Sequence, residues 1–90
     1  MSSDKVSLLR KKIDLIDCEI VDLLCVRARL AKAISEEKKK AGKPVRDLKR
    51  EQEVLARVCS RFRKKGSDVP FDIRKVYLQV IKACIEVEEK

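Results

Sequence analysis

Residues 20–34 read IVDLLCVRARLAKAI, and their spacing identifies the main structural element of the chain. Their apolar residues continue a seam that begins at Val6 and alternates strictly between steps of three and four, which predicts one face of a long α-helix. The seam consists of Val6, Leu9, Ile13, Ile16, Ile20, Leu23, Arg27, Leu30 and Ile34. Arg27 therefore stands at a position where the pattern requires an apolar side chain.

The first helix is long because no residue interrupts it before Gly42 and Pro44. It can begin at any of three good N-cap residues, Ser2, Ser3 and Asp4. A helix of about 37 residues is about 55 Å long, roughly twice the length of either helix that can follow it. Neither of those helices covers the whole seam, so we expect a second copy of the chain to cover it in a homodimer.

Two shorter helices are predicted after the first. AGKPVRD (41–47) has the composition of a loop, and Asp47 is a suitable N-cap for a second helix that ends at Gly66. SDVP (67–70) then opens a third helix of about 20 residues, with Pro70 in its first turn. We therefore predict an all-α fold of three helices per chain.

The composition limits the number of domains and the class of partner. A chain of 90 residues forms a single domain, 1–90, and its 23 basic and 15 acidic residues give a net charge of +8. Such a surface favours nucleic acid, an acidic membrane or a small polyanionic substrate. The N-terminus has no apolar signal segment and no 18-residue uncharged run exists, so we expect a soluble, cytoplasmic protein.

The cysteines do not indicate a metal site, because they form no C-x-x-C pair and the chain has no histidine. Cys18, Cys25, Cys59 and Cys84 all lie within or beside apolar stripes. We expect all four to be small buried hydrophobes in a reducing cytosol.

Three cations of the first helix can converge on an apolar floor. Arg27 and Lys38 are eleven residues apart, so they differ by about 20° around the helix and by about 16 Å along it. Ala31 and Ile34 lie between them. Arg10 is about 25 Å from Arg27 along the same helix, but Arg10 of an antiparallel partner chain can reach the Arg27 site. This arrangement favours a pocket for a small dianion, because Arg binds carboxylate through two parallel hydrogen bonds.

Simpler interpretations remain open at this point. Arg27 can pair with an Asp or Glu of another helix, and Lys38 and Arg10 can lie on solvated faces. Glu88 falls on the apolar stripe of the third helix, where a carboxyl group tends to take up a proton and become a donor. It can equally belong to a solvated C-terminus.

The chain resembles the all-helical class of chorismate mutase, over about residues 6–88. The resemblance rests on three segments: LLRKKIDLID (8–17), LLCVRARLAKAISEEK (23–38) and GKPVRDLKREQEVL (42–55). The third segment, with Pro-Val-Arg-Asp followed by Arg50 and Glu51, is the most specific. The resemblance implies intertwined homodimers of three-helix chains and the Claisen rearrangement of chorismate to prephenate, on the route to phenylalanine and tyrosine. It also implies a reaction without cofactor, metal or covalent intermediate.

The resemblance also implies a role for each site residue. Arg27 would bind one substrate carboxylate and Arg10 of the partner chain the other. Lys38 would donate to the ether oxygen and a carboxylate, as a fixed donor for the charge that develops there. Arg50 would line the site and support the carboxylate contacts. Glu51 would accept a hydrogen bond from the substrate hydroxyl, which the backbone of Asp47 would also meet. Cys84 and Glu88 would face the substrate from the third helix. The absence of any added domain suggests a monofunctional enzyme.

The identity of Glu88 predicts a pH-dependent rate, because many bacterial relatives have Gln there and a carboxyl group donates a hydrogen bond only when it is protonated. We expect turnover to fall with rising pH as Glu88 ionises. A Glu88→Gln variant should flatten the profile of kcat against pH, and an unchanged profile would contradict the idea. Many of those relatives have Ser at the position of Cys84, and a thiol is the weaker donor.

Three other functions are compatible with parts of the sequence. An isochorismate–pyruvate lyase shares this fold and a cationic pocket, although the complete PVRD…RE loop with Glu51 favours the mutase. A basic nucleic-acid-binding module would explain the net charge and the cluster RFRKK (61–65), but few aromatics are present for stacking. In a purely structural coiled coil, Arg27 would set the register and would tolerate replacement by Leu.

Overall fold

A computed structural model of the chain describes residues 2–66 and 68–90, and the side chains of residues 4–66 and 68–90. Within this part the chain forms three α-helices, α1 (Ser2–Lys40), α2 (Leu48–Lys65) and α3 (Ile73–Glu88). The predicted all-α class with one long and two shorter helices is confirmed. Asp4 lies in the first turn of α1 and is not its N-cap, and the predicted caps Ser2 and Ser3 have side chains outside the described part.

The two ends of α2 lie where the sequence predicts them. Asp47 is the N-cap, and its carboxylate Oδ1 accepts the backbone N–H of Arg50 at 3.0 Å. At the other end Gly66 has φ 64° and ψ 40°, a left-handed conformation that glycine adopts without steric cost. Its N–H donates to the carbonyl of Arg63 at 3.1 Å and closes the last turn.

The predicted start of the third helix at Pro70 is wrong, because α3 begins at Ile73 and has 16 residues. Asp72 caps it, with its Oδ1 accepting the N–H of Lys75 at 3.0 Å. The preceding residue, Phe71, packs its ring on that of Phe62 in α2 with centroids 5.8 Å apart. This ring pair and the aspartate cap keep the segment before Ile73 out of the helix. Ser67, the predicted first residue of that segment, lies outside the described residues.

The chain divides into two compact units, one up to Leu30 and one from Ala31. In the first unit the apolar seam of α1 faces solvent, with side chains between 45% exposed at Val6 and 68% exposed at Leu23. The prediction that all four cysteines are buried is confirmed for Cys84 alone, since Cys18 and Cys25 of α1 are exposed and Cys59 of α2 is half-buried. The described part of this unit is a single helix, so its cysteines are exposed as its apolar seam is.

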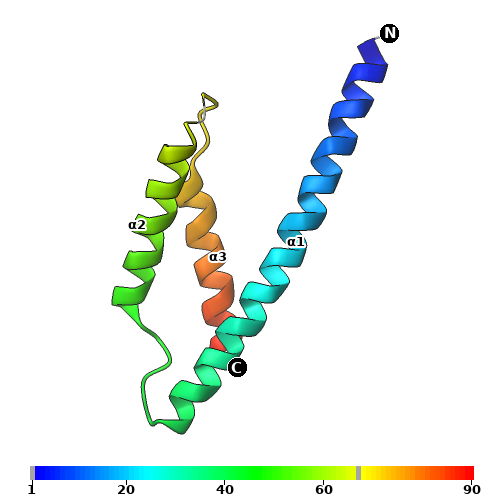
Figure 1. Cartoon of the computed structure of the whole chain (residues 1–90). Coiled ribbons are helices and arrows are strands. Elements are labelled where there is room, and N and C mark those ends of the chain that lie inside the picture. Colours follow the sequence, from blue (N-terminus) through cyan, green and yellow to red (C-terminus); the bar gives the residue numbers. More distant parts are fainter. Residues whose placement is uncertain (1, 67) are drawn as a thin grey trace. The chain divides into compact units, whose positions relative to one another are not determined.

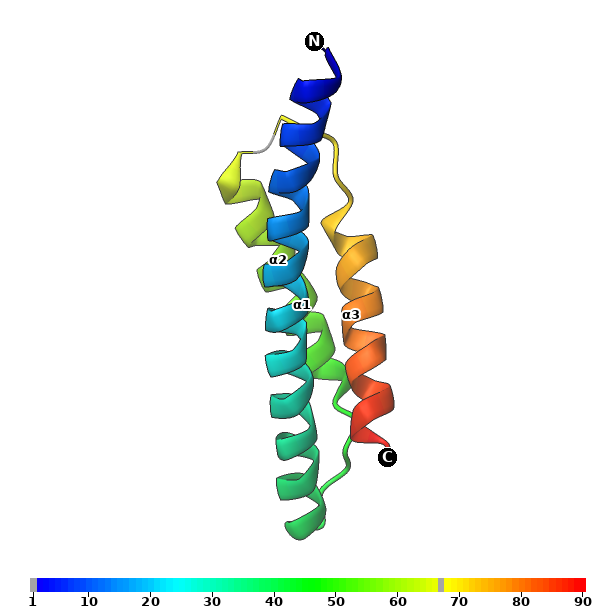
Figure 2. The same cartoon turned by 90° about the vertical axis from the view of Figure 1, so that its right-hand side faces the viewer.

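In the second unit α2 and α3 lie side by side and run antiparallel, joined by the connection at 66–72 (Figure 1). Figure 2 shows the same pair from a second side. The buried residues of this unit are Ala31, Ser35, Leu55, Ile81 and Cys84. The fully buried hydroxyl of Ser35 donates to the carbonyl of Lys32 at 2.8 Å, so its burial leaves no polar group unpaired. No helix in the described residues is long and apolar enough to cross a bilayer.

Candidate active site

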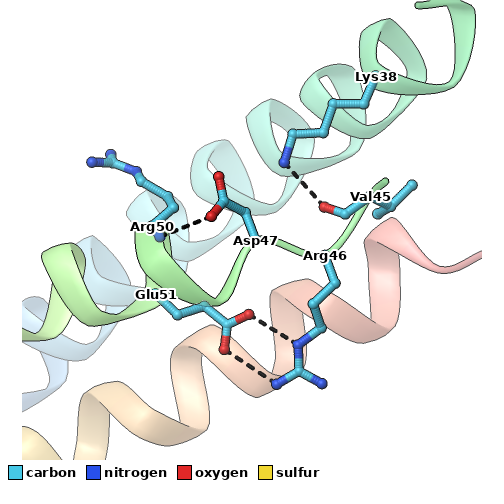
Figure 3. Close-up of polar contacts among 6 residues, drawn as sticks. All are labelled: Lys38, Val45, Arg46, Asp47, Arg50 and Glu51. Carbon is cyan, nitrogen blue, oxygen red and sulfur yellow. Dashed lines mark hydrogen bonds and ion pairs between the residues drawn. The ribbon is translucent and has the colours of Figure 1, made fainter. Parts of the chain in front are cut away.

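Both the backbone and the side chain of Lys38 hold the loop that follows α1. Its backbone carbonyl accepts the N–H of Lys43 at 2.8 Å, while Gly42 (φ 68°) donates to Lys39 at 3.1 Å. This pair of bonds is a Schellman motif, which ends α1 and reverses the chain. The ammonium Nζ of Lys38 then donates to the carbonyl oxygen of Val45 at 3.0 Å (Figure 3). Lys38 is half-buried, and its positive charge is therefore held against the backbone of the loop at Val45.

A two-pronged ion pair joins the same loop to α2. Arg46 Nε donates to Glu51 Oε2 at 3.0 Å and Nη2 donates to Oε1 at 3.2 Å, one bond to each carboxylate oxygen (Figure 3). The hydrogen bond and the charge of Glu51 raise the pKa of the Arg46 guanidinium. The Glu51 side chain is only 19% exposed, whereas the Arg46 side chain is 55% exposed. Glu51 also lies in the first turn of α2, where the helix dipole favours a negative charge.

At the start of α2, the side chain of Asp47 is held in place, whereas that of Arg50 can move. The side chain of Asp47 is used by the helix as its cap. The Arg50 side chain is 53% exposed, and its guanidinium lies 3.8 Å from the Glu53 carboxylate, a distance too long for a strong hydrogen bond. An exposed pair of this kind contributes little to stability, so Arg50 can turn towards an anion without loss to the fold.

The two predicted site residues of α3 belong to the second unit. Cys84 is buried among the residues that fill this unit, and Glu88, half-buried, is the last residue of α3. The structure thus places six of the predicted site residues in the second unit, and Figure 3 shows four of these around the loop. The six are Lys38, Asp47, Arg50, Glu51, Cys84 and Glu88.

The remaining two predicted site residues, Arg10 and Arg27, lie on α1 in the first unit. Arg10 is exposed and Arg27 is half-buried. They are 17 positions apart in the sequence, which corresponds to about 25 Å of helix. Two guanidinium groups at this spacing cannot both bind one small dianion within a single chain.

Two contacts of the site were not predicted from the sequence. Arg46 and Glu51 are five residues apart across a loop and a helix start, so no helical periodicity links them. The bond from Lys38 to Val45 ends on a backbone carbonyl, which carries no sequence signal. The available signal for the first contact was the pairing of opposite charges on either side of the N-cap Asp47.

Taken together, the loop and the start of α2 can bind an anion and orient a hydroxyl group. Lys38 and Arg50 supply positive donors, and Glu51 supplies a fixed acceptor. The described residues contain no group of three or more Cys, Asp or Glu that could hold a metal ion, and the sequence has no His. The chemistry favoured by these groups is charge stabilisation and positioning.

Comparisons with known proteins agree on one family. The chorismate mutase type II family matches residues 9–89. A bifunctional chorismate mutase/prephenate dehydratase of Aquifex aeolicus is 41% identical over 85 residues, which cover 91% of this chain and 23% of that protein. A chorismate mutase of Methanocaldococcus jannaschii is 40% identical over 55 residues, 61% of this chain and 56% of that protein. The match thus spans about a quarter and about half of these two curated relatives.

A solved structure extends the similarity to the whole fold. The chorismate mutase (form II) of Thermus thermophilus has a TM-score of 0.83 and 34% sequence identity to this chain. The superposition covers 96% of each chain. All three helices and the loop of Figure 3 therefore have counterparts in a protein of similar size.

Proposed function

Because the chain belongs to the chorismate mutase type II family, we propose that it catalyses the rearrangement of chorismate to prephenate. The observation that carries this proposal is the family match over residues 9–89, which includes the whole loop and the start of α2. The product would serve the biosynthesis of phenylalanine and tyrosine in the cytoplasm. In this proposal residues 1–90 act as one chorismate mutase domain without a cofactor.

The proposed mechanism needs no base or nucleophile, because the rearrangement breaks a C–O bond and forms a C–C bond within one molecule. The protein must hold the substrate in its compact reactive shape, which charged groups on both carboxylates can do. Arg27 would bind one carboxylate, with support from Arg50. Lys38 would donate to the ether oxygen, where negative charge develops as the C–O bond breaks.

The other site residues would orient the rest of the substrate. Glu51 would accept a hydrogen bond from the substrate hydroxyl, which the backbone of Asp47 would also meet. Protonated Glu88 would add a second donor to the ether oxygen. Cys84 would line the pocket mainly as an apolar surface, since a thiol is a weak donor.

We propose further that the active enzyme is an intertwined homodimer in which the partner chain supplies Arg10. The exposed apolar seam of α1 supports this, because so many large side chains in solvent favour association. The spacing of Arg10 and Arg27 supports it as well, since a second carboxylate-binding arginine would have to come from elsewhere.

The direct test is conversion of chorismate by the purified chain, followed by loss of chorismate absorbance and formation of prephenate. We expect turnover by the wild type, and a loss of at least about a hundredfold in kcat/KM for Arg27→Ala because a carboxylate contact is removed. Arg29→Ala is the matched control, since Arg29 is an exposed arginine outside the seam. Release of pyruvate from isochorismate, with no reaction of chorismate, would instead identify a lyase.

A further inference from the structure

We propose that Arg46 is a positioning residue for the mutase reaction, which holds the Glu51 carboxylate oriented towards the substrate hydroxyl. This inference rests on the proposed function, in which Glu51 accepts that hydroxyl. Arg46 itself would touch no reacting atom. Its contribution would pass entirely through Glu51.

The geometry of the pair leaves acceptor capacity on Glu51. The two bonds, 3.0 and 3.2 Å long, engage one lone pair on each carboxylate oxygen. An ionised carboxylate has about four acceptor positions, so about two stay open after a two-pronged arginine has bound. The fork also fixes the plane of the carboxylate. The open positions of Glu51 consequently have a defined direction.

The backbone around Arg46 is anchored on both sides. On one side, the carbonyl oxygen of Val45 accepts a hydrogen bond from the Lys38 ammonium. On the other side, the carboxylate of Asp47 accepts the N–H of Arg50 and so caps α2 (Figure 3). The backbone position from which the Arg46 side chain extends is therefore held on both sides. Through this loop, Lys38 and Glu51 are held in one framework, so a change at Arg46 alters the placement of Glu51 first.

Burial distinguishes a positioning role from a purely structural one. The Arg46 side chain is 55% exposed and the Glu51 side chain is 19% exposed, so Arg46 is the more solvent-accessible partner of the pair. Solvent around the exposed arginine screens the attraction between the two charges, which limits the contribution of the pair to folding. Loss of Arg46 should therefore affect catalysis more than stability.

Charge gives Arg46 a second effect. A chorismate dianion brings two negative charges to a site that already contains the Glu51 carboxylate. The guanidinium of Arg46 compensates that carboxylate at hydrogen-bond distance. Without it, Glu51 would repel the substrate as well as turn away from the hydroxyl. We therefore expect Arg46→Ala to raise KM and to lower kcat.

A double-mutant cycle in kcat and KM for chorismate tests the inference. Arg46→Ala should lower kcat/KM about tenfold in the wild type but change it less than about twofold in a Glu51→Ala background. Independent effects, in which the double variant loses the product of both single losses, would overturn it. A merely structural role would give the same loss in both backgrounds.

Two further variants separate orientation from charge and from folding. Arg46→Lys keeps the charge without the fork, so it should restore KM but not kcat. Lys40→Ala, which removes an exposed ion pair with Glu37 at 3.4 Å, is the matched control and should leave both constants unchanged. If Arg46→Ala fails to fold by circular dichroism, the cycle is run with Arg46→Lys. An inactive wild type refutes the proposed function, whereas an active wild type with normal Arg46 variants refutes only this inference.

Discussion

Replacing Lys38 by methionine should lower kcat for chorismate by about a thousandfold, because one fixed donor to a developing negative charge is worth about 10²–10³. Methionine keeps most of the apolar stem, so the half-buried space stays filled. The ammonium already donates a hydrogen bond to the backbone carbonyl oxygen of Val45 at 3.0 Å, which fixes its position. Its loss removes charge from the place where the ether oxygen is proposed to lie.

The matched control for this variant is Lys39→Met, one residue further along α1. Lys39 is exposed, lies in the same last turn and has the same charge. Any general effect of net charge or helix dipole is therefore common to both variants. Stopped assays of prephenate over a range of chorismate concentrations separate kcat from KM. Equal losses in the two variants would show that Lys38 acts only through net charge.

The helices could be predicted because local signals dominate their formation. The three-and-four spacing from Val6 to Ile34 predicts α1, and the cap signals at Asp47 and Gly66 predict the bounds of α2. These signals depend on residues within one or two turns of each other. The start of α3 could not be found in this way, since it depends on Asp72 and on contact of Phe71 with Phe62 of another helix.

The site could be predicted in its residue types but not in its contacts. The seam pattern pointed to Arg27, and the eleven-residue spacing from Arg27 pointed to Lys38. The family resemblance added the residues of the loop. The ion pair between Arg46 and Glu51 depends on how the loop turns between α1 and α2, which no short-range spacing describes. The exposure of Cys18 likewise depends on which faces of α1 are covered, a property of packing rather than of the stripe in which the residue lies.

Mixing chains that carry Arg10→Ala with chains that carry Arg27→Ala should restore activity that neither variant has alone. Each homodimer lacks one carboxylate-binding arginine at both of its sites. If Arg10 acts across the interface, one site of a mixed dimer combines an intact Arg27 from one chain with an intact Arg10 from the other. The second site of the same dimer lacks both arginines.

The size of the recovery follows from random association. About half of the dimers are mixed and half of their sites are intact, so the mixture should reach about a quarter of wild-type kcat per site. Refolding the two variants together from denaturant allows the chains to exchange. The maximal rate at saturating chorismate, divided by that of the wild type at the same protein concentration, then gives the fraction of active sites. The exposed seam of α1, 45% at Val6 and 68% at Leu23, is the surface on which these chains would associate.

A second mixture, Arg27→Ala with Lys38→Ala, provides the matched control. Both residues are proposed to serve the site of their own chain, so every site of every mixed dimer lacks one of them and no activity should return. If Arg10 acted within its own chain, the first mixture would stay inactive as well, because each site would keep its own defect. Recovery in the first mixture alone is therefore specific to an arginine supplied by the partner, which is what the 25 Å or so of helix between Arg10 and Arg27 requires.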